Sequence, residues 1–325
     1  MVRRLVVLPG QTEQLSSASQ SEPDLPNIII MHLFDEATRV TPVSINENKG
    51  VYRANIHPAF RIGGYLSAVV AHAGSQFLQS KSSTLTDPIH VTCQYYGVCK
   101  LGEATIEIEA AKMGRNQVNL RGRLVQNGKD VVEGHFIYGN LAKENGYGMS
   151  FKSDRDLTPF DPKKSPDPVD PIPTFAPHMD WWHDYEKIEE AGAKGQALSA
   201  AWSRFHDDRP LDPYSIIFLA DCPLPAIFHL PDEVLPVKGW VPTVTISVHI
   251  IRAPSDGVTI ASSSQATKFF HKGRLESDGE VKEWIDGREQ IVAISRQMAL
   301  FGAQTLAANL GREDLNSIPG KKSKL

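Results

Sequence analysis

The chain has 325 residues, of which 41% are hydrophobic, 22% charged and 8% aromatic, with a formal net charge of −4. This apolar share, together with only three cysteines, excludes a collagen-like, a disordered and a disulfide-stapled chain. No apolar run approaches the ~20 residues that a membrane span needs, and the slightly acidic balance argues against a nucleic-acid partner. At ~150 residues per domain, the length predicts two globular units.

The cysteines, Cys93, Cys99 and Cys222, form no C-x-x-C pair and have no histidine or cysteine at zinc-ligand spacing. We interpret them as reduced, structural thiols, in a compartment that does not depend on disulfides. Because no metal-ligand spacing is present, the sequence predicts no metal site, and it predicts no cofactor. The first apolar stretch is too short for a convincing signal peptide.

The last three residues, Ser323, Lys324 and Leu325, spell a peroxisomal targeting signal that an import receptor reads. The polar stretch over 311–325 predicts a flexible tail that exposes the tripeptide to solvent. We therefore expect a peroxisomal protein whose partners include that receptor. The alternative is an ordinary basic tail.

The first half of the chain has the pattern of a helix followed by antiparallel strands. Residues 1–27 predict a flexible extension, and 28–153 a first domain. Within it the patterns predict helices at 28–38 and 65–78, and strands at 51–56, 88–97, 103–112, 117–126 and 130–140. This order is typical of an α+β fold.

A proline-rich segment over 154–178 divides the chain near its middle. Prolines disfavour both helix and central strand, so this segment predicts an extended linker. The second domain, 179–310, then repeats the order of the first, with strands at 197–205, 242–252, 258–270, 279–285 and 289–301, and a helix at 214–221. Aligning Gly64 with Pro213 pairs the two helices, so the chain is predicted to be internally duplicated.

The common phosphate-binding and serine-hydrolase motifs are absent from the sequence. Two polar clusters, at 183–186 and 206–208, lack metal-ligand spacing, and we interpret both as solvated loops.

Asp221 ends an apolar helix, with Pro223 and Pro225 directly behind it. The negative end of the helix dipole and partial burial both disfavour the ionised carboxylate. They would raise the pKa of Asp221 towards the range of a general base. The alternative is a partly exposed aspartate that caps a turn.

Two more polar residues lie on apolar strands. Strict alternation puts Thr243 on a polar face of its strand, and Gln297 shares a face with the small Ala293, Ser295 and Ala299. Small neighbours leave room for a ligand beside the amide. The alternative is that Thr243 and Gln297 merely face solvent.

The segments at 218–225, 243–252 and 291–300 resemble the C-terminal half of double-hotdog type II acyl-CoA thioesterases, and 61–68 resembles the glycine pair that opens their first long helix. The resemblance implies an α+β fold of two tandem hotdog domains that form a pseudo-dimer. It also implies a thioester hydrolase for acyl-CoA substrates, in lipid or secondary metabolism. Further association into a homo-oligomer stays open.

By the same resemblance, Asp221, Thr243 and Gln297 would hold and activate the attacking water. Backbone amides at Gly63, Gly64 and Tyr65 would bind substrate and its developing oxyanion. His72, the counterpart of Asp221 in the first half, makes a second identical site improbable, and we interpret it as a packed helix histidine.

The sequence departs from the family at 96–99, which leaves the shape of the substrate channel in doubt. The proline-rich linker could cover the site. Two other functions stay open: a hotdog lyase acting on a CoA-bound or polyketide-type intermediate, and a non-catalytic acyl-CoA-binding protein. Hotdog hydratases pair an aspartate with a histidine five residues later, whereas position 226 is alanine and the next histidine is His229.

Overall fold

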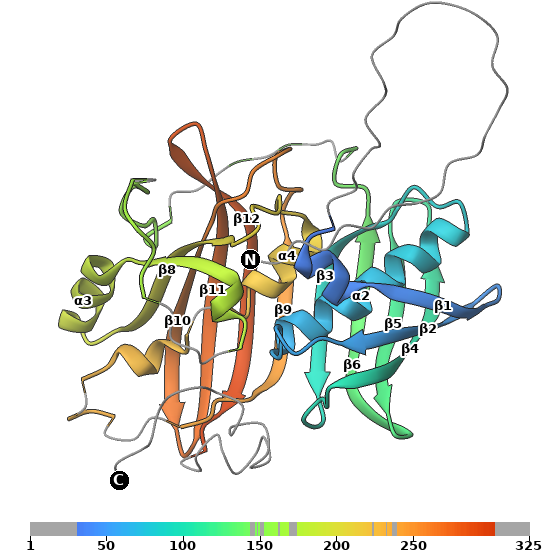
Figure 1. Ribbon diagram of the computed structural model, residues 1–325, viewed down its shortest axis with the longest axis horizontal. Coiled ribbons are helices and arrows are strands. Elements are labelled where there is room, and N and C mark those ends of the chain that lie inside the picture. The colour runs from blue at the N-terminus through green and yellow to red at the C-terminus, as the bar shows by residue number, and fades with distance from the viewer. Residues whose placement is uncertain are drawn as a thin grey trace, which may run out of the picture.

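The computed structural model describes residues 31–302, apart from 144–146, 148, 150–152, 162, 169–173, 223, 232 and 236–238. These residues build a twelve-stranded antiparallel sheet in the order β1-β2-β4-β5-β6-β3-β9-β12-β11-β10-β8-β7. Figure 1 shows the first half of the chain in blue to green and the second in yellow to red, with α2 and α4 together where the halves meet. The expected extension at 1–27 and the tail at 311–325 lie outside the described residues.

The first half contributes two helices and six strands. They are α1 (Leu33–Thr38), β1 (Val40–Ile45), β2 (Lys49–Ile56), α2 (Gly63–Ser80), β3 (Asp87–Tyr95), β4 (Gly102–Met113), β5 (Val118–Gln126) and β6 (Lys129–Gly139). Helix α2 is apolar around most of its circumference and is buried along most of its length, as expected of a helix wrapped by a sheet. No helix among the described residues is both long and apolar enough to cross a membrane.

The second half repeats this plan with a shorter central helix. Its elements are η1 (Ala176–His178), β7 (Met179–His183), α3 (Tyr185–Ala193), β8 (Ala197–Phe205), α4 (Pro213–Leu219), η2 (Ala226–His229), β9 (Thr243–Ile250), β10 (Ala261–His271), β11 (Arg274–Ile285) and β12 (Arg288–Leu300). Pro213 opens α4 behind the N-cap Asp212, whose carboxylate accepts the backbone N–H of Ser215 in a capping box.

The halves join edge to edge through β3 and β9, where Thr92 is opposite Ser247 and Cys93 opposite Ile246. The strand order on one side of this seam mirrors the order on the other. The predicted duplication and the α+β class are therefore confirmed. The joined sheet also places α2 against α4, so that one helix from each half shares a single core.

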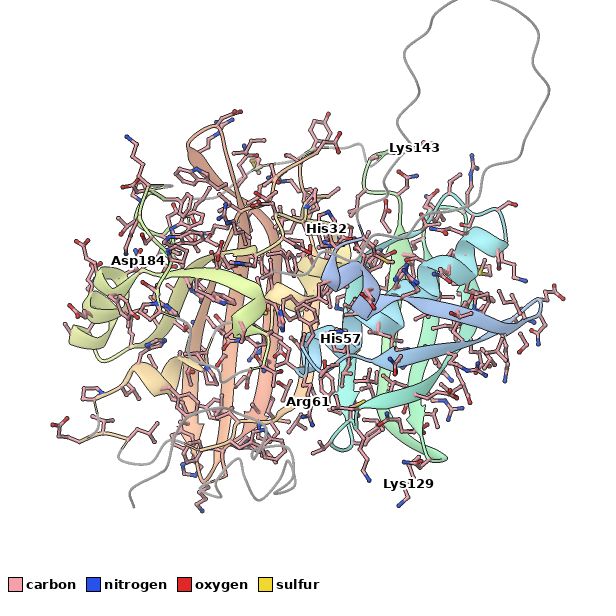
Figure 2. The ribbon with its side chains drawn as sticks, viewed as in Figure 1. His32, His57, Arg61, Lys129, Lys143 and Asp184 are labelled. Carbon is pink, nitrogen blue, oxygen red and sulfur yellow. The ribbon has the colours of Figure 1, made fainter. Side chains whose placement is uncertain are left out.

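Sequence patterns missed β1, β7 and α3. Strand β1 contains Pro42, which is tolerated because the strand lies at the sheet edge. The interpretation of 183–186 as a solvated loop was wrong. Asp184 is buried and caps α3 by accepting the backbone N–H of Lys187, and His183 bonds the Asp167 carboxylate. In Figure 2, Asp184 lies beside α3 at the outer edge of the second half.

The described part of the proline-rich segment packs onto the second half. Leu157 and Phe160 are buried, with the Phe160 ring against the rings of Trp182 and Trp202. The ammonium group of Lys282, almost fully buried, lies 2.8 Å from the Asp156 carboxylate and fastens the segment to β11. A buried charge of this kind is retained only when it is paired.

Candidate active site

Asp221 lies just after α4, because Leu219 is the last helical residue and the backbone N–H of Asp221 bonds the Phe218 carbonyl oxygen. The side chain keeps part of its surface accessible, although protein atoms surround it on most sides. Asp221 is therefore not simply a turn-capping aspartate, because its carboxylate accepts hydrogen bonds from residues of α2, β9 and β12.

The structure brings Asp221, Thr243 and Gln297 together. Gln297 Nε2 donates to Asp221 Oδ1 over 2.8 Å and to Thr243 Oγ1 over 2.6 Å. Thr243 Oγ1 donates to Asp221 Oδ1 over 3.2 Å. The alternative that Gln297 faces solvent is wrong, because its side chain is buried. A hydroxyl, an amide and a carboxylate from β9, β12 and the end of α4 thus share one polar cluster.

The start of α2 closes the cluster from the other half. Gly64 N–H donates to Asp221 Oδ2 over 2.7 Å, and Gly63 N–H also bonds this carboxylate. Position 64 must be glycine, because a Cβ there would lie 2.7 Å from Asp221 Cβ and 2.9 Å from the Phe218 carbonyl oxygen. The resemblance implied that these amides bind an oxyanion, whereas in this structure they bind the carboxylate.

Burial raises the pKa of Asp221 from 3.8 to about 6, against the hydrogen bonds from Gly64, Thr243, Gln297 and Gly63, which lower it. Asp221 follows the C-terminal end of α4, as expected, but its carboxylate also faces the positive end of α2, which favours the ionised form. Burial wins, and the group titrates close to the range of a general base.

Tyr65 does not reach this cluster with its side chain. Its ring is fully buried, and its hydroxyl donates to the Ala37 carbonyl oxygen and accepts the backbone N–H of His57. The Tyr65 side chain therefore anchors α2 to the chain that precedes it, and the substrate-binding role expected of the Tyr65 backbone amide stays a prediction.

Two residues of the site escaped the sequence analysis. Tyr95, at the end of β3, approaches Gly63 so closely that a Cβ there would lie 3.0 Å from the tyrosine hydroxyl, and that hydroxyl lies 2.7 Å from Ser67 Oγ. Gln265, on β10, donates from Nε2 to Gln297 Oε1 over 2.7 Å. The position of Tyr95 directly before the departing segment 96–99 was the only sequence signal for it.

The corresponding position in the first half has different chemistry. A ring nitrogen of His72 lies 3.0 Å from the Thr38 carbonyl oxygen, and the His72 ring packs 4.8 Å from the Tyr214 ring. Tyr138 fills the adjacent space and donates to the Ala71 carbonyl oxygen. The interpretation of His72 as a packed helix histidine agrees with these contacts.

Within the described part of the chain, no group of three or more histidine, cysteine or acidic side chains is arranged to hold a metal ion. Cys93, Cys99 and Cys222 are free thiols, and burial raises the pKa of Cys93 and Cys99 to about 12.

Two family models match the chain: an acyl-CoA thioesterase N-terminal domain over residues 58–139, and an acyl-CoA thioesterase C-terminal domain over residues 154–301. They follow one another in the expected order and together span most of the sequence. The chain therefore belongs to the acyl-CoA thioesterase family and folds as a double hotdog.

Solved structures agree on this fold. A conserved protein of unknown function with a hot dog fold from Alicyclobacillus acidocaldarius is 18% identical, with a TM-score of 0.67, and the match covers 85% of this chain and 100% of that one. The acyl-CoA thioesterase II TesB2 from Mycobacterium marinum is 16% identical, with a TM-score of 0.61 and coverage of 83% and 97%. At these identities the likeness concerns the fold alone. No curated protein sequence matches the chain.

Proposed function

We propose that this protein hydrolyses an acyl-CoA thioester to the free acid and CoA, with Asp221 as general base and Thr243 and Gln297 as the groups that hold the water. The observation that carries the proposal is the Asp221 carboxylate, which accepts from both side chains in a partly buried cluster where its pKa is about 6. The two thioesterase domain models support the reaction class.

In the proposed reaction a water molecule enters the cluster by replacing the longest contact, between Thr243 Oγ1 and Asp221 Oδ1. The water oxygen bonds to the thioester carbonyl carbon while its proton passes to Asp221. The tetrahedral intermediate then expels the CoA sulfur, which takes up the proton, and Asp221 returns to its ionised form. General-base help of this kind contributes ~10²–10⁴-fold.

The start of α2 supplies the charge stabilisation. Its amides at Gly63 and Gly64 face the carboxylate before the reaction, when Asp221 carries the negative charge. As the proton moves to Asp221, the charge moves to the thioester oxygen. Because these amides already bond Asp221 Oδ2, the positive end of the α2 dipole, and not a direct hydrogen bond, would stabilise that oxyanion.

The two alternatives have less support at the site. A hydratase would need a histidine beside the base, but the nearest one in sequence, His229, lies 3.2 Å from Ser199 Oγ on β8. The hydrogen-bond partners of Asp221 among the described residues include no histidine. An inert binding protein would not require a carboxylate held by so many donors.

The test is to incubate the purified protein with a panel of saturated and 2-enoyl-CoAs, and to follow thiol release, hydration of the double bond and ligand binding in parallel. Thiol release is the expected result. Hydration without thiol release would identify a lyase, and binding with neither reaction would identify a non-catalytic acyl-CoA-binding protein. Either of these outcomes would overturn the proposal.

We further propose that Ser323, Lys324 and Leu325, which lie outside the described residues, direct the protein to peroxisomes through the import receptor. A fluorescent protein fused to the N-terminus should localise to peroxisomes, and deletion of Leu325 should leave the fusion diffuse. An unchanged distribution after the deletion would contradict this assignment.

A further inference from the structure

Gln265 lies outside the cluster but is connected to it through Gln297. Gln265 is on β10, opposite Gly279 of β11, and Gly279 is in turn opposite Ser295 of β12. The side chain of Gln265 therefore crosses an entire strand before its Nε2 donates to Gln297 Oε1 over 2.7 Å. Both glutamine side chains are buried, at 4% and 9% exposure, so bulk water does not compete for this bond.

Gly279 keeps the path between the two glutamines open. A Cβ at this position would lie 2.6 Å from Ser295 Oγ and 3.1 Å from the Ser264 carbonyl oxygen, and would also touch Gln265 Cγ at 3.8 Å. A larger residue on β11 would therefore crowd the space that the glutamine side chain crosses. The absence of a side chain on the intervening strand is what makes the long contact between β10 and β12 feasible.

A glutamine amide has two orientations, which exchange its nitrogen and its oxygen. In the orientation present here, both hydrogens of Gln297 Nε2 are used, one towards Asp221 and one towards Thr243. The reversed orientation would place an oxygen against a carboxylate oxygen. An ionised Asp221 therefore helps to select the correct orientation, because it can only accept.

That selection weakens during the reaction, because Asp221 becomes a donor once it holds the proton of the water. The bond from Gln265 does not depend on the protonation state of Asp221. We propose that Gln265 is a positioning residue, which holds the Gln297 amide with its nitrogen towards Asp221 and Thr243 throughout turnover. This inference rests on the proposed hydrolysis for its catalytic meaning, but the orientation itself is measurable without it.

Two substitutions separate positioning from simple packing. Gln265→Met keeps the length and burial of the side chain but removes the donor. Gln265→Glu introduces a carboxylate, which when ionised can only accept, so Gln297 would turn its nitrogen towards it and its oxygen towards Asp221. The matched control is Gln290→Met on β12, whose side chain accepts from Arg252 about 23 Å along the strand from Gln297.

For Gln265→Met we expect kcat to fall about 10- to 100-fold with KM within about twofold of wild type, because the Gln297 oxygen loses its partner. For Gln265→Glu we expect activity to decline at alkaline pH, where wild type is flat. Gln290→Met should keep wild-type kcat. The proposal would be overturned if both Gln265 variants kept the kcat and the pH dependence of wild type. It would also be overturned if Gln290→Met lost as much kcat as Gln265→Met, in parallel with a loss of stability.

A second readout is independent of turnover. The carboxylate infrared band of Asp221, isolated by subtracting the spectrum of the Asp221→Asn counterpart, gives its titration midpoint. The other titratable groups against it, Tyr95 and Cys222, stay neutral near pH 6, because burial raises the pKa of each well above its ordinary value. In Gln265→Met the midpoint should rise, since Gln297 donates less reliably. An unchanged midpoint would overturn the positioning role of Gln265. Absence of thiol release by the wild-type protein would overturn only the proposed hydrolysis.

Discussion

Gly64 donates its backbone N–H to Asp221 over 2.7 Å, although 157 residues separate the two in sequence. The bond joins the first turn of α2 in one half to the end of α4 in the other. The Asp221 carboxylate is therefore held by both hotdog domains, and neither half contains the complete cluster. The two helices pack antiparallel, because the start of α2 lies against the end of α4 and His72, further along α2, lies against Tyr214 at the start of α4.

The first prediction concerns this contact. Gly64→Ala would place a Cβ 2.9 Å from the Phe218 carbonyl oxygen and 3.0 Å from that of Ile217, and these backbone atoms cannot move without shifting α4. We expect thiol release to fall at least about 10-fold and the protein to lose about 1–3 kcal/mol of stability, as in other overpacked cores. Gly192→Ala, where a Cβ meets nothing within 4 Å, is the control and should keep full activity. Wild-type turnover in Gly64→Ala would show that the contact is not needed.

The second prediction concerns Thr243 and Gln297, the two groups proposed to hold the water. Thr243→Val and Gln297→Leu each remove a donor to Asp221 while keeping the approximate shape of the side chain. We expect kcat to fall about 10- to 1,000-fold in each, as for other single donors in catalytic sites. The double variant should lose less than the product of the two effects, because both groups serve the same water. If both single variants turn over like wild type, the assignment of Thr243 and Gln297 fails, even if Asp221 is essential.

The third prediction is the pH dependence of kcat/KM. A general base acts only when ionised, so activity should rise with pH through about 6 and level off above pH 7. The initial-rate profile of thiol release from a stable acyl-CoA, corrected for the uncatalysed reaction, gives this midpoint. A profile with its midpoint near 4 would mean that burial does not control the pKa of Asp221. A profile that is flat from pH 4 to 9 would argue against a carboxylate base.

The fourth prediction concerns stability. Because burial raises the pKa of Asp221 to about 6, ionising it costs more in the folded than in the unfolded protein. Its contribution to stability is complete below pH 3.8 and is lost as pH rises through about 6. The free energy of unfolding of Asp221→Asn, relative to that of wild type, should therefore be about 1–3 kcal/mol higher at pH 8 than at pH 4. The partial exposure of the carboxylate reduces this difference. Urea unfolding at both pH values measures this difference, and parallel stabilities would contradict it.

The duplication was predictable because hydrophobic alternation and turn residues mark most strands locally. The strand predicted at 197–205 coincides with β8, and those of the β5–β6 and β11–β12 hairpins agree closely with the structure, apart from the early start of β11. Strand β1 and helix α3 were missed because an edge strand with a proline, and a helix that buries only Ile188 and Ala191, carry weak patterns. The register that sets Gln265 beside Gln297 across β11 depends on tertiary pairing, which no local pattern contains.

The candidate base was visible in the sequence, but its environment was not. Asp221 stood out because it is an acidic residue that follows an apolar helix and precedes two prolines. The helix end that it faces, α2 of the other half, follows from the packing of the two domains and opposes the expected dipole effect. Tyr95 and Gln265 likewise reach the site only through that packing.

The most direct measurement of the central claim is the rate of CoA thiol release by Asp221→Asn, compared with wild type on the best acyl-CoA of the panel, with folding checked by circular dichroism. The proposed mechanism predicts a rate lower by ~10²–10⁴-fold while the variant still binds the acyl-CoA. A folded Asp221→Asn protein that releases thiol at the wild-type rate would contradict it.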